Sequence, residues 1–123
     1  MLHGTTVLVI EEEFLIALDI QRMLEALGAG EIFFARGAAE ASRQQELWAG
    51  AGLAIIDMAL QRTAALDLIP QLLANDVAVV LCSADAALKH LGVPQFPHLP
   101  VVTKPMAETD LVHAIGKVFS SPV

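Results

Sequence analysis

The chain has 123 residues, a formal net charge of −7 and a pI near 4.8, and 55% of its residues are hydrophobic. This length predicts a single domain, residues 1–123, and the hydrophobic content excludes a disordered chain. The negative charge argues against direct nucleic-acid binding, because phosphate backbones repel acidic surfaces. No apolar run approaches the ~18 residues of a membrane span, no secretory signal is visible and Cys82 alone cannot form an internal disulfide. We therefore expect a cytoplasmic protein without a membrane partner.

Short apolar segments, rich in β-branched or aromatic residues, alternate with helical patterns along the chain. The predicted strands cover residues 5–10, 31–35, 52–56, 77–82 and 100–104. The predicted helices cover residues 13–27, 38–48, 67–75, 84–91 and 107–119. In the third helix, Pro70 is compatible only with a start near Asp67, because proline removes an intrahelical hydrogen bond. Five successive β-α units whose strands are apolar on both faces predict a three-layer α/β fold around a parallel sheet.

Polar residues stand where four of the five predicted strands end. Glu11 and Glu12 follow the first strand, Asp57 the third and Ser83 the fourth, and Lys104 ends the fifth. Because ligands bind at the carboxyl ends of parallel strands, we expect three carboxylates, one hydroxyl and one ammonium group at a single rim.

Clustered carboxylates repel one another, so something must offset the cost of gathering them. A divalent cation would do so, and oxygen-only ligands favour Mg²⁺ over zinc. The second strand ends in Ala35 and Arg36, without an acid or a hydroxyl, which suits a position at the edge of the sheet.

The segments LVIEEE, AIID, VLCSA and TKP, in this order and each at a strand end, resemble those of a bacterial response-regulator receiver domain. The resemblance covers essentially the whole chain and implies a flavodoxin-like (βα)5 fold with strand order 2-1-3-4-5. It implies a signalling domain that catalyses only its own phosphorylation and dephosphorylation. We expect a stand-alone domain without attached output domain, with a piece cut from a longer protein as the open alternative. The implied partners are a histidine kinase or phosphotransfer protein, an unknown downstream protein, and a second copy of the chain through the fourth helix, fifth strand and fifth helix.

The resemblance also implies a role for each residue at the acidic end of the site. Asp57 would be the phosphoacceptor, and a carboxylate that attacks phosphorus gives an acyl phosphate. Glu11, Glu12 and Asp57 would hold Mg²⁺ together with the backbone carbonyl of Ala59.

Three further residues would contact the transferred group. Ser83 would be the switch hydroxyl, and the backbone amide of Ala84 would face the phosphoryl oxygens. Lys104 would contact the same oxygens, and the Lys104–Pro105 peptide bond is typically cis in this family. Negative charge spreads over three equatorial oxygens in the transition state, so a cation on each flank is expected.

Departures from the family pattern leave two alternatives open. Glu12 stands where Asp is usual, Ala65 where Gly is common, and Val101 where a Tyr or Phe often acts as a rotamer switch. These residues leave open, as the alternative to a phosphoacceptor, a pseudo-receiver that binds partners without phosphorylation. The second alternative is an aspartyl-nucleophile phosphatase. Enzymes of this class usually need a second Asp two residues after the nucleophile, and Ala59 at that position argues against it.

One apolar cluster on the first helix lies off the stripe formed by Ile16 and Ile20. Exposed apolar clusters mark interaction surfaces, and in receivers this helix commonly docks the kinase. The kinase-docking hypothesis therefore names Phe14, Leu15 and Leu18.

Other residues that could carry chemistry are predicted to be structural. The four histidines show no metal-ligand spacing. Cys82 is interpreted as a buried strand residue, and Trp48 as a partly packed residue near the end of the second helix.

Overall fold

The computed structural model describes residues 1–58, 62–85, 87 and 92–119. Its strands form one parallel sheet in the order β2-β1-β3-β4-β5. The strands are β1 (Val7–Ile10), β2 (Ile32–Ala35), β3 (Leu53–Asp57), β4 (Ala78–Ser83) and β5 (Val101–Thr103). The helices are α1 (Phe14–Ala26), α2 (Ala38–Arg43), α3 (Gln45–Trp48), α4 (Arg62–Ala74) and α6 (Glu108–Phe119). The predicted fold class and strand order are confirmed.

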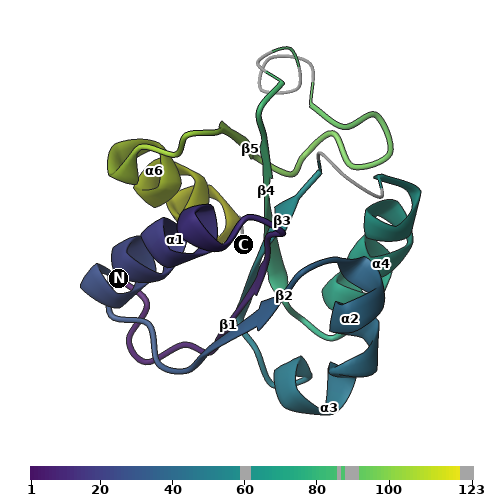
Figure 1. Cartoon of the computed structure of the whole chain (residues 1–123), viewed down its shortest axis with the longest axis horizontal. Helices are drawn as coiled ribbons and strands as arrows, with labels where there is room; N and C mark the ends of the chain where they lie inside the picture. Colours follow the sequence, from purple (N-terminus) through teal and green to yellow (C-terminus); the bar gives the residue numbers. More distant parts are fainter. Residues whose placement is uncertain (59–61, 86, 88–91, 120–123) are drawn as a thin grey trace.

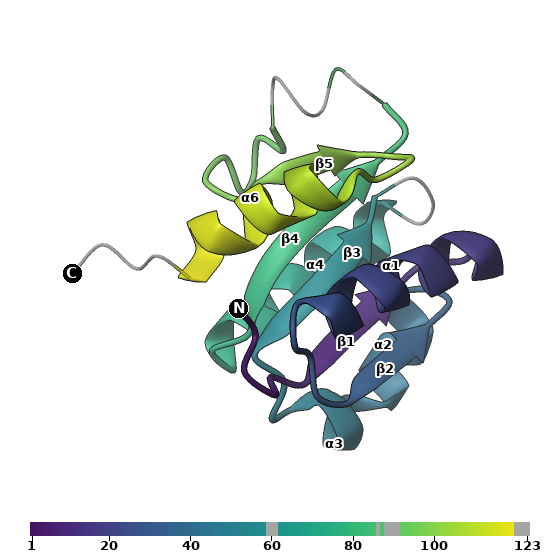
Figure 2. The same cartoon turned by 90° about the vertical axis from the view of Figure 1, so that its left-hand side faces the viewer.

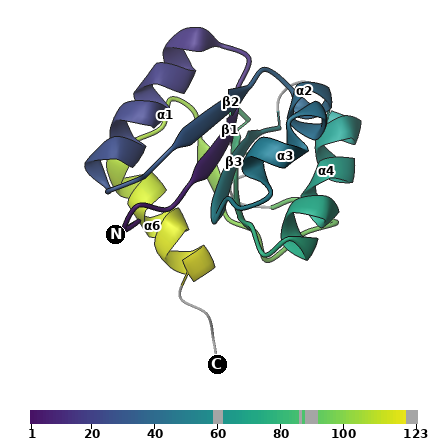
Figure 3. The ribbon, with the colours of Figure 1, turned by 90° about the horizontal axis from the view of Figure 1, so that it is seen from below.

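Helices cover both faces of the sheet, which gives three layers. Helices α1 and α6 lie over one face and α2, α3 and α4 over the other (Figures 1 and 3). Within β1, Val7 and Val9 pack toward α1 and α6, whereas Leu8 and Ile10 pack toward α2 and α4. This two-residue alternation buries both faces of β1, which is why its sequence is continuously apolar.

The same alternation decides on which face the site lies. Leu53 and Ile55 of β3 belong to the core beneath α1 and α6, so Asp57 has the same orientation. Asp57 pairs with Cys82 of β4, and Lys104 follows β5 directly. Figure 2 shows α1 and α6 next to each other on this face. Residues distant in sequence therefore meet at the carboxyl ends of the strands, beside α1.

The helix predicted over residues 38–48 is interrupted at Gln44. Its φ of −100° and ψ of 17° end α2 and precede the short α3. The prediction that Trp48 is only partly packed is wrong, because Trp48 is fully buried in the core between the sheet and α4. Its indole Nε1–H donates a 2.6 Å hydrogen bond to the carbonyl oxygen of Ala41, so the turn satisfies the one polar group of the indole.

Helix α4 begins at Arg62 rather than near Asp67, so Pro70 lies in its interior. The cost of this proline is limited because Pro70 is on the exposed side, where water can reach the Leu66 carbonyl that lacks an N–H partner. Leu68, Ile69 and Leu72 are buried in the core, and their burial stabilises the helix and offsets that cost.

The predicted helix over residues 84–91 falls mostly outside the described residues. Strand β4 runs one residue beyond its predicted end, to Ser83. Within the described part of the chain, no helix combines the length and apolarity needed to cross a bilayer.

Candidate functional site

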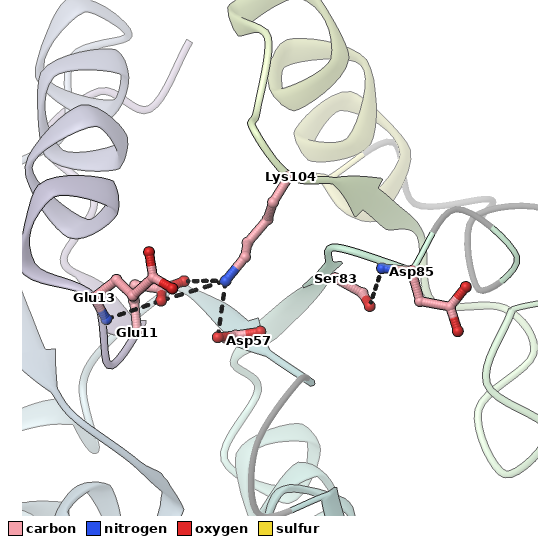
Figure 4. A network of polar contacts seen from close by, with 6 residues as sticks. All are labelled: Glu11, Glu13, Asp57, Ser83, Asp85 and Lys104. Atoms are coloured by element: carbon pink, nitrogen blue, oxygen red, sulfur yellow. Dashed lines mark hydrogen bonds and ion pairs between the residues drawn. The ribbon is translucent and has the colours of Figure 1, made fainter.

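An ammonium group joins two carboxylates at the carboxyl ends of β1 and β3. Lys104 Nζ lies 3.0 Å from Asp57 Oδ2 and 3.1 Å from Glu11 Oε2, and the three side chains are drawn in Figure 4. The backbone N–H of Lys104 also donates to the Ser83 carbonyl at 2.9 Å, which fixes the start of its side chain against β4. The predicted convergence of these three residues is therefore a feature of the fold.

Burial and hydrogen bonding set the charge states of this cluster. Glu11 is only 5% exposed, and burial raises its pKa although hydrogen bonds from the Glu13 N–H and from Lys104 oppose the shift. Burial alone would lower the pKa of Lys104, but its hydrogen bonds to Asp57 and Glu11 outweigh that effect and raise it. Lys104 therefore carries its charge throughout the neutral range.

Ser83 ends β4 next to Asp57 and is 2% exposed. Its Oγ accepts a 3.0 Å hydrogen bond from the Asp85 N–H, and Asp85 Oδ1 in turn accepts one of 2.9 Å from the Ala87 N–H (Figure 4). A hydroxyl has one proton to donate besides its two acceptor lone pairs. The Ser83 hydroxyl can therefore donate to a new oxygen while its Oγ still accepts the hydrogen bond from the Asp85 N–H.

Glu12 has a different environment from Glu11. Its side chain is exposed and lines, together with Asp57, a pocket of about 390 Å³ between the sheet rim and α2. Of the described residues, those whose His, Cys, Asp or Glu ligand atoms lie within 4.8 Å of one another are Glu11, Asp57 and Cys82. Glu12 thus shares the pocket of Asp57 but is not part of this group.

The donor set fits a divalent cation. Glu11, Glu12 and Asp57 bring three carboxylates to the rim, and Lys104 contacts two of them, those of Glu11 and Asp57. Burial raises the pKa of the Cys82 thiol, so the sulfur stays protonated and the available ligands are oxygens. Oxygen ligands suit Mg²⁺.

The remaining predicted residues are placed as follows. Ala59 lies outside the described residues, and Ala84 is exposed directly after β4. The Lys104–Pro105 peptide bond is cis, as the resemblance implied. Cys82 is buried, as predicted.

The apolar cluster on α1 is partly as predicted. Phe14 and Leu15 are 73% and 76% exposed, whereas Leu18 is half-buried. Phe14 and Leu18 line a second pocket of about 410 Å³ that also includes Phe34 of β2. The exposed surface is therefore continuous with a groove between α1 and β2.

Sequence reasoning missed two residues beside Asp57. Arg36 and Arg43 line the same pocket as Glu12 and Asp57. Arg36 is the first residue after β2, so its position at the strand rim was a usable signal. Arg43 is the last residue of α2, seven residues after Arg36, and only the packing of α2 against β2 and α4 reveals its place.

The repulsion between Glu11 and Asp57, which share one ammonium group, predicts that Asp57→Asn stabilises the fold. The amide keeps the shape of the side chain and an oxygen that can accept from Lys104, but it removes repulsion with Glu11. We expect the free energy of unfolding to rise by about 1 kcal/mol in Mg²⁺-free buffer. Urea denaturation of both proteins measures this, and the gain should shrink when Mg²⁺ is added. A variant less stable than wild type would contradict the electrostatic description.

Comparison with solved structures shows that this fold is similar to that of response-regulator receiver domains. No family model and no curated protein sequence matches the chain. Among solved structures, it is 27% identical to the receiver (REC) domain of the response regulator PhyR from Erythrobacter litoralis, over 99% of this chain and 97% of that one, with a TM-score of 0.72.

Two further structures extend this similarity. A variant of the anti-anti-sigma factor PhyR from Bartonella quintana is 28% identical with a TM-score of 0.73, over 94% of this chain and 48% of that one. SdrG from Sphingomonas melonis is 24% identical with a TM-score of 0.74, over 96% and 98% of the two chains, and shows the shared fold. The present chain thus spans about half the length of the longer PhyR chains.

Proposed function

We propose that this chain, a response-regulator receiver domain in its fold, takes up a phosphoryl group on Asp57. The observation that carries the proposal is the position of Lys104 Nζ, 3.0 Å from the Asp57 carboxylate and 3.1 Å from that of Glu11. A lysine on an exposed surface would need no such partners. Here the ammonium lies where phosphoryl oxygens bonded to Asp57 would be, in a rim that also carries three carboxylates able to hold a divalent cation.

The transfer follows from the nucleophile and its neighbours. An oxygen of Asp57 attacks phosphorus, a P–O bond forms, and the P–N bond to the histidine of the donor breaks, so that the imidazole leaves with the electron pair. Lys104 stabilises the charge that develops on the equatorial oxygens. When bound by Glu11, Glu12 and Asp57, Mg²⁺ would supply the second cation that this charge requires. The backbone carbonyl of Ala59 stays a predicted further ligand.

Phosphorylation would be read out through Ser83. The new group adds a charge of roughly −1.5 to −2 and three strong acceptors. The Ser83 hydroxyl proton and the backbone amide of Ala84, both at the end of β4, are the donors that we assign to those acceptors. A shift of Ser83 would move Asp85, because the two are hydrogen-bonded, and the loop after β4 would change its surface.

The partners of this reaction are part of the proposal. We assign donation to a histidine kinase or phosphotransfer protein that docks on α1 at Phe14, Leu15 and Leu18. A downstream protein of unknown identity would recognise the phosphorylated surface. Three predictions remain. Two chains would pair through the predicted helix over residues 84–91, β5 and α6. The protein would be cytoplasmic, and residues 1–123 would form a single domain.

The decisive experiment measures covalent phosphorylation. Wild type is incubated with acetyl phosphate and Mg²⁺, and intact-mass spectrometry should show the gain of one phosphoryl group. The gain should be absent in Asp57→Asn and after removal of Mg²⁺ by chelation, because the nucleophile or the second cation is then missing. Modification of Asp57→Asn to the same extent would place the acceptor elsewhere.

One observation favours a second candidate, a pseudo-receiver that binds partners without phosphorylation. Glu12 is exposed and does not join Glu11 and Asp57 in the close group of ligand atoms. No mass gain on wild type, combined with unaltered binding of a partner by Asp57→Asn, would establish this alternative.

A further inference from the structure

The pocket beside Asp57 contains two guanidinium-bearing side chains that the proposed chemistry has not used. Arg36 follows β2 and Arg43 ends α2, and both line the pocket of about 390 Å³ that Asp57 and Glu12 also line. Lys104 reaches Asp57 from the end of β5, which is the edge strand at the opposite end of the sheet from β2. Cations from both sides of the rim therefore lie around the proposed nucleophile.

The two guanidinium groups are not engaged elsewhere. Within residues 1–58, 62–85, 87 and 92–119, no ion pair includes Arg36 or Arg43. Glu40, the acid closest to them on α2, is engaged by other groups. Its Oε2 accepts the backbone N–H of Arg36 at 3.1 Å, and its Oε1 accepts from Gln44 Nε2 at 3.4 Å.

This placement is unusual for so acidic a chain. The sequence has 7 Lys and Arg against 14 Asp and Glu, and among the described side chains Arg36, Arg43 and Lys104 lie around Asp57. A guanidinium presents a planar set of donors that matches the oxygens of a phosphate group. We propose that Arg36 and Arg43 form an oxyanion subsite beside Asp57, which binds the phosphate group of an incoming phosphodonor.

The subsite has a defined part in the reaction, and that part rests on the proposed function. The phosphate dianion of the donor would first contact Arg36 and Arg43 from the α2 side. Its oxygens would then pass to Lys104 as the P–O bond to Asp57 forms. Arg36 and Arg43 would therefore determine how tightly the donor binds and would have little effect on the rate of the bound complex.

Binding of inorganic phosphate tests the subsite without any chemical step. In the wild-type chain without Mg²⁺, titration with phosphate should shift the Nε–Hε resonances of Arg36 and Arg43 and leave that of Arg22 unchanged. R36Q/R43Q should weaken phosphate binding about tenfold or more, the loss expected for charge-assisted hydrogen bonds. R36K/R43K keeps both charges without the planar fork and should give an intermediate affinity.

Arg22→Gln is the matched control, because Arg22 is an exposed arginine on α1 whose only described ion pair, with Asp19, is local. An equal loss of phosphate binding in Arg22→Gln, or wild-type affinity in R36Q/R43Q, would overturn the proposal. Circular dichroism verifies that each variant folds, and the single variants R36Q and R43Q replace the double variant if it does not.

Kinetics separate the subsite from the proposed function. In R36Q/R43Q, the concentration of acetyl phosphate that gives half-maximal phosphorylation should rise about tenfold, while the maximal rate changes little. An unchanged half-saturating concentration would refute the subsite and leave Asp57 as the acceptor. Arginine-dependent phosphate binding in a wild type that is never phosphorylated would refute the acceptor role and leave the subsite in place.

Discussion

Lys104→Met should lower the rate of Asp57 phosphorylation by about 100-fold or more, the loss typical when one preorganised charge stabiliser is removed. The ammonium lies 3.0 Å from Asp57 and is the described cation closest to it. Methionine retains the unbranched shape but supplies neither the charge nor the hydrogen bonds. The measurement is the rate of acetyl phosphate-dependent mass gain at saturating Mg²⁺.

The same variant should be less stable. Without Lys104, the carboxylates of Glu11 and Asp57, whose side chains are 0% and 7% exposed, face each other without a cation. Loss of one partner of a buried ion pair costs about 3 kcal/mol. The deficit should be smaller in acid than at neutral pH. The pKa of Glu11 is already raised by burial and would rise further, so protonation would relieve the repulsion.

Lys117→Met is the matched control for both measurements, because Lys117 is an exposed lysine of α6 outside this cluster. Asp57 of this variant should be phosphorylated at the wild-type rate, and its free energy of unfolding should change little. A wild-type phosphorylation rate in Lys104→Met would show that the ammonium has no part in the transfer.

Phe14→Asp combined with Leu15→Asp should abolish transfer from the kinase while transfer from acetyl phosphate continues. Both side chains are about three-quarters exposed, so their replacement removes apolar contact area from a docking surface without opening the core. Leu18 belongs to the same docking hypothesis, but it is half-buried and its replacement would also disturb packing. The measurement compares phosphorylation by a kinase and by the small donor in the same preparation.

Leu47→Asp provides the control for this pair, since Leu47 is an exposed leucine of α3, more than half accessible and remote from α1. Its transfer from the kinase should match that of wild type. Loss of transfer from acetyl phosphate in Phe14→Asp/Leu15→Asp would mean that the site itself was damaged. Unchanged transfer from the kinase would rule out docking on this part of α1.

The sheet was predictable because its sequence signal is redundant. Each strand is apolar on both faces, and the alternation seen for Val7 and Leu8 requires helices on both sides. Asp57 and Lys104 could be predicted as site residues since each marks the end of such a strand. The carboxyl edge of a parallel sheet then brings them together whatever the intervening sequence.

Other features depend on tertiary packing that no local pattern encodes. The break at Gln44 occurs without Gly or Pro, and the buried indole of Trp48 compensates for it through its bond to Ala41. Pro70 argued for a late helix start, but the burial of neighbouring leucines outweighs this local preference. Arg43 joins the pocket only because α2 packs against β2 and α4.

The buried Trp48 also determines what optical spectroscopy can report about this chain. It is the single tryptophan, and the sequence contains no tyrosine. It ends α3, the helix that precedes the first residue of β3, whereas Asp57 is the last residue of that strand. Figure 1 shows α3 and β3. The emission of Trp48 should therefore be blue-shifted and should follow loss of the core on denaturation. Phosphorylation or metal binding at the acidic rim should change this emission very little.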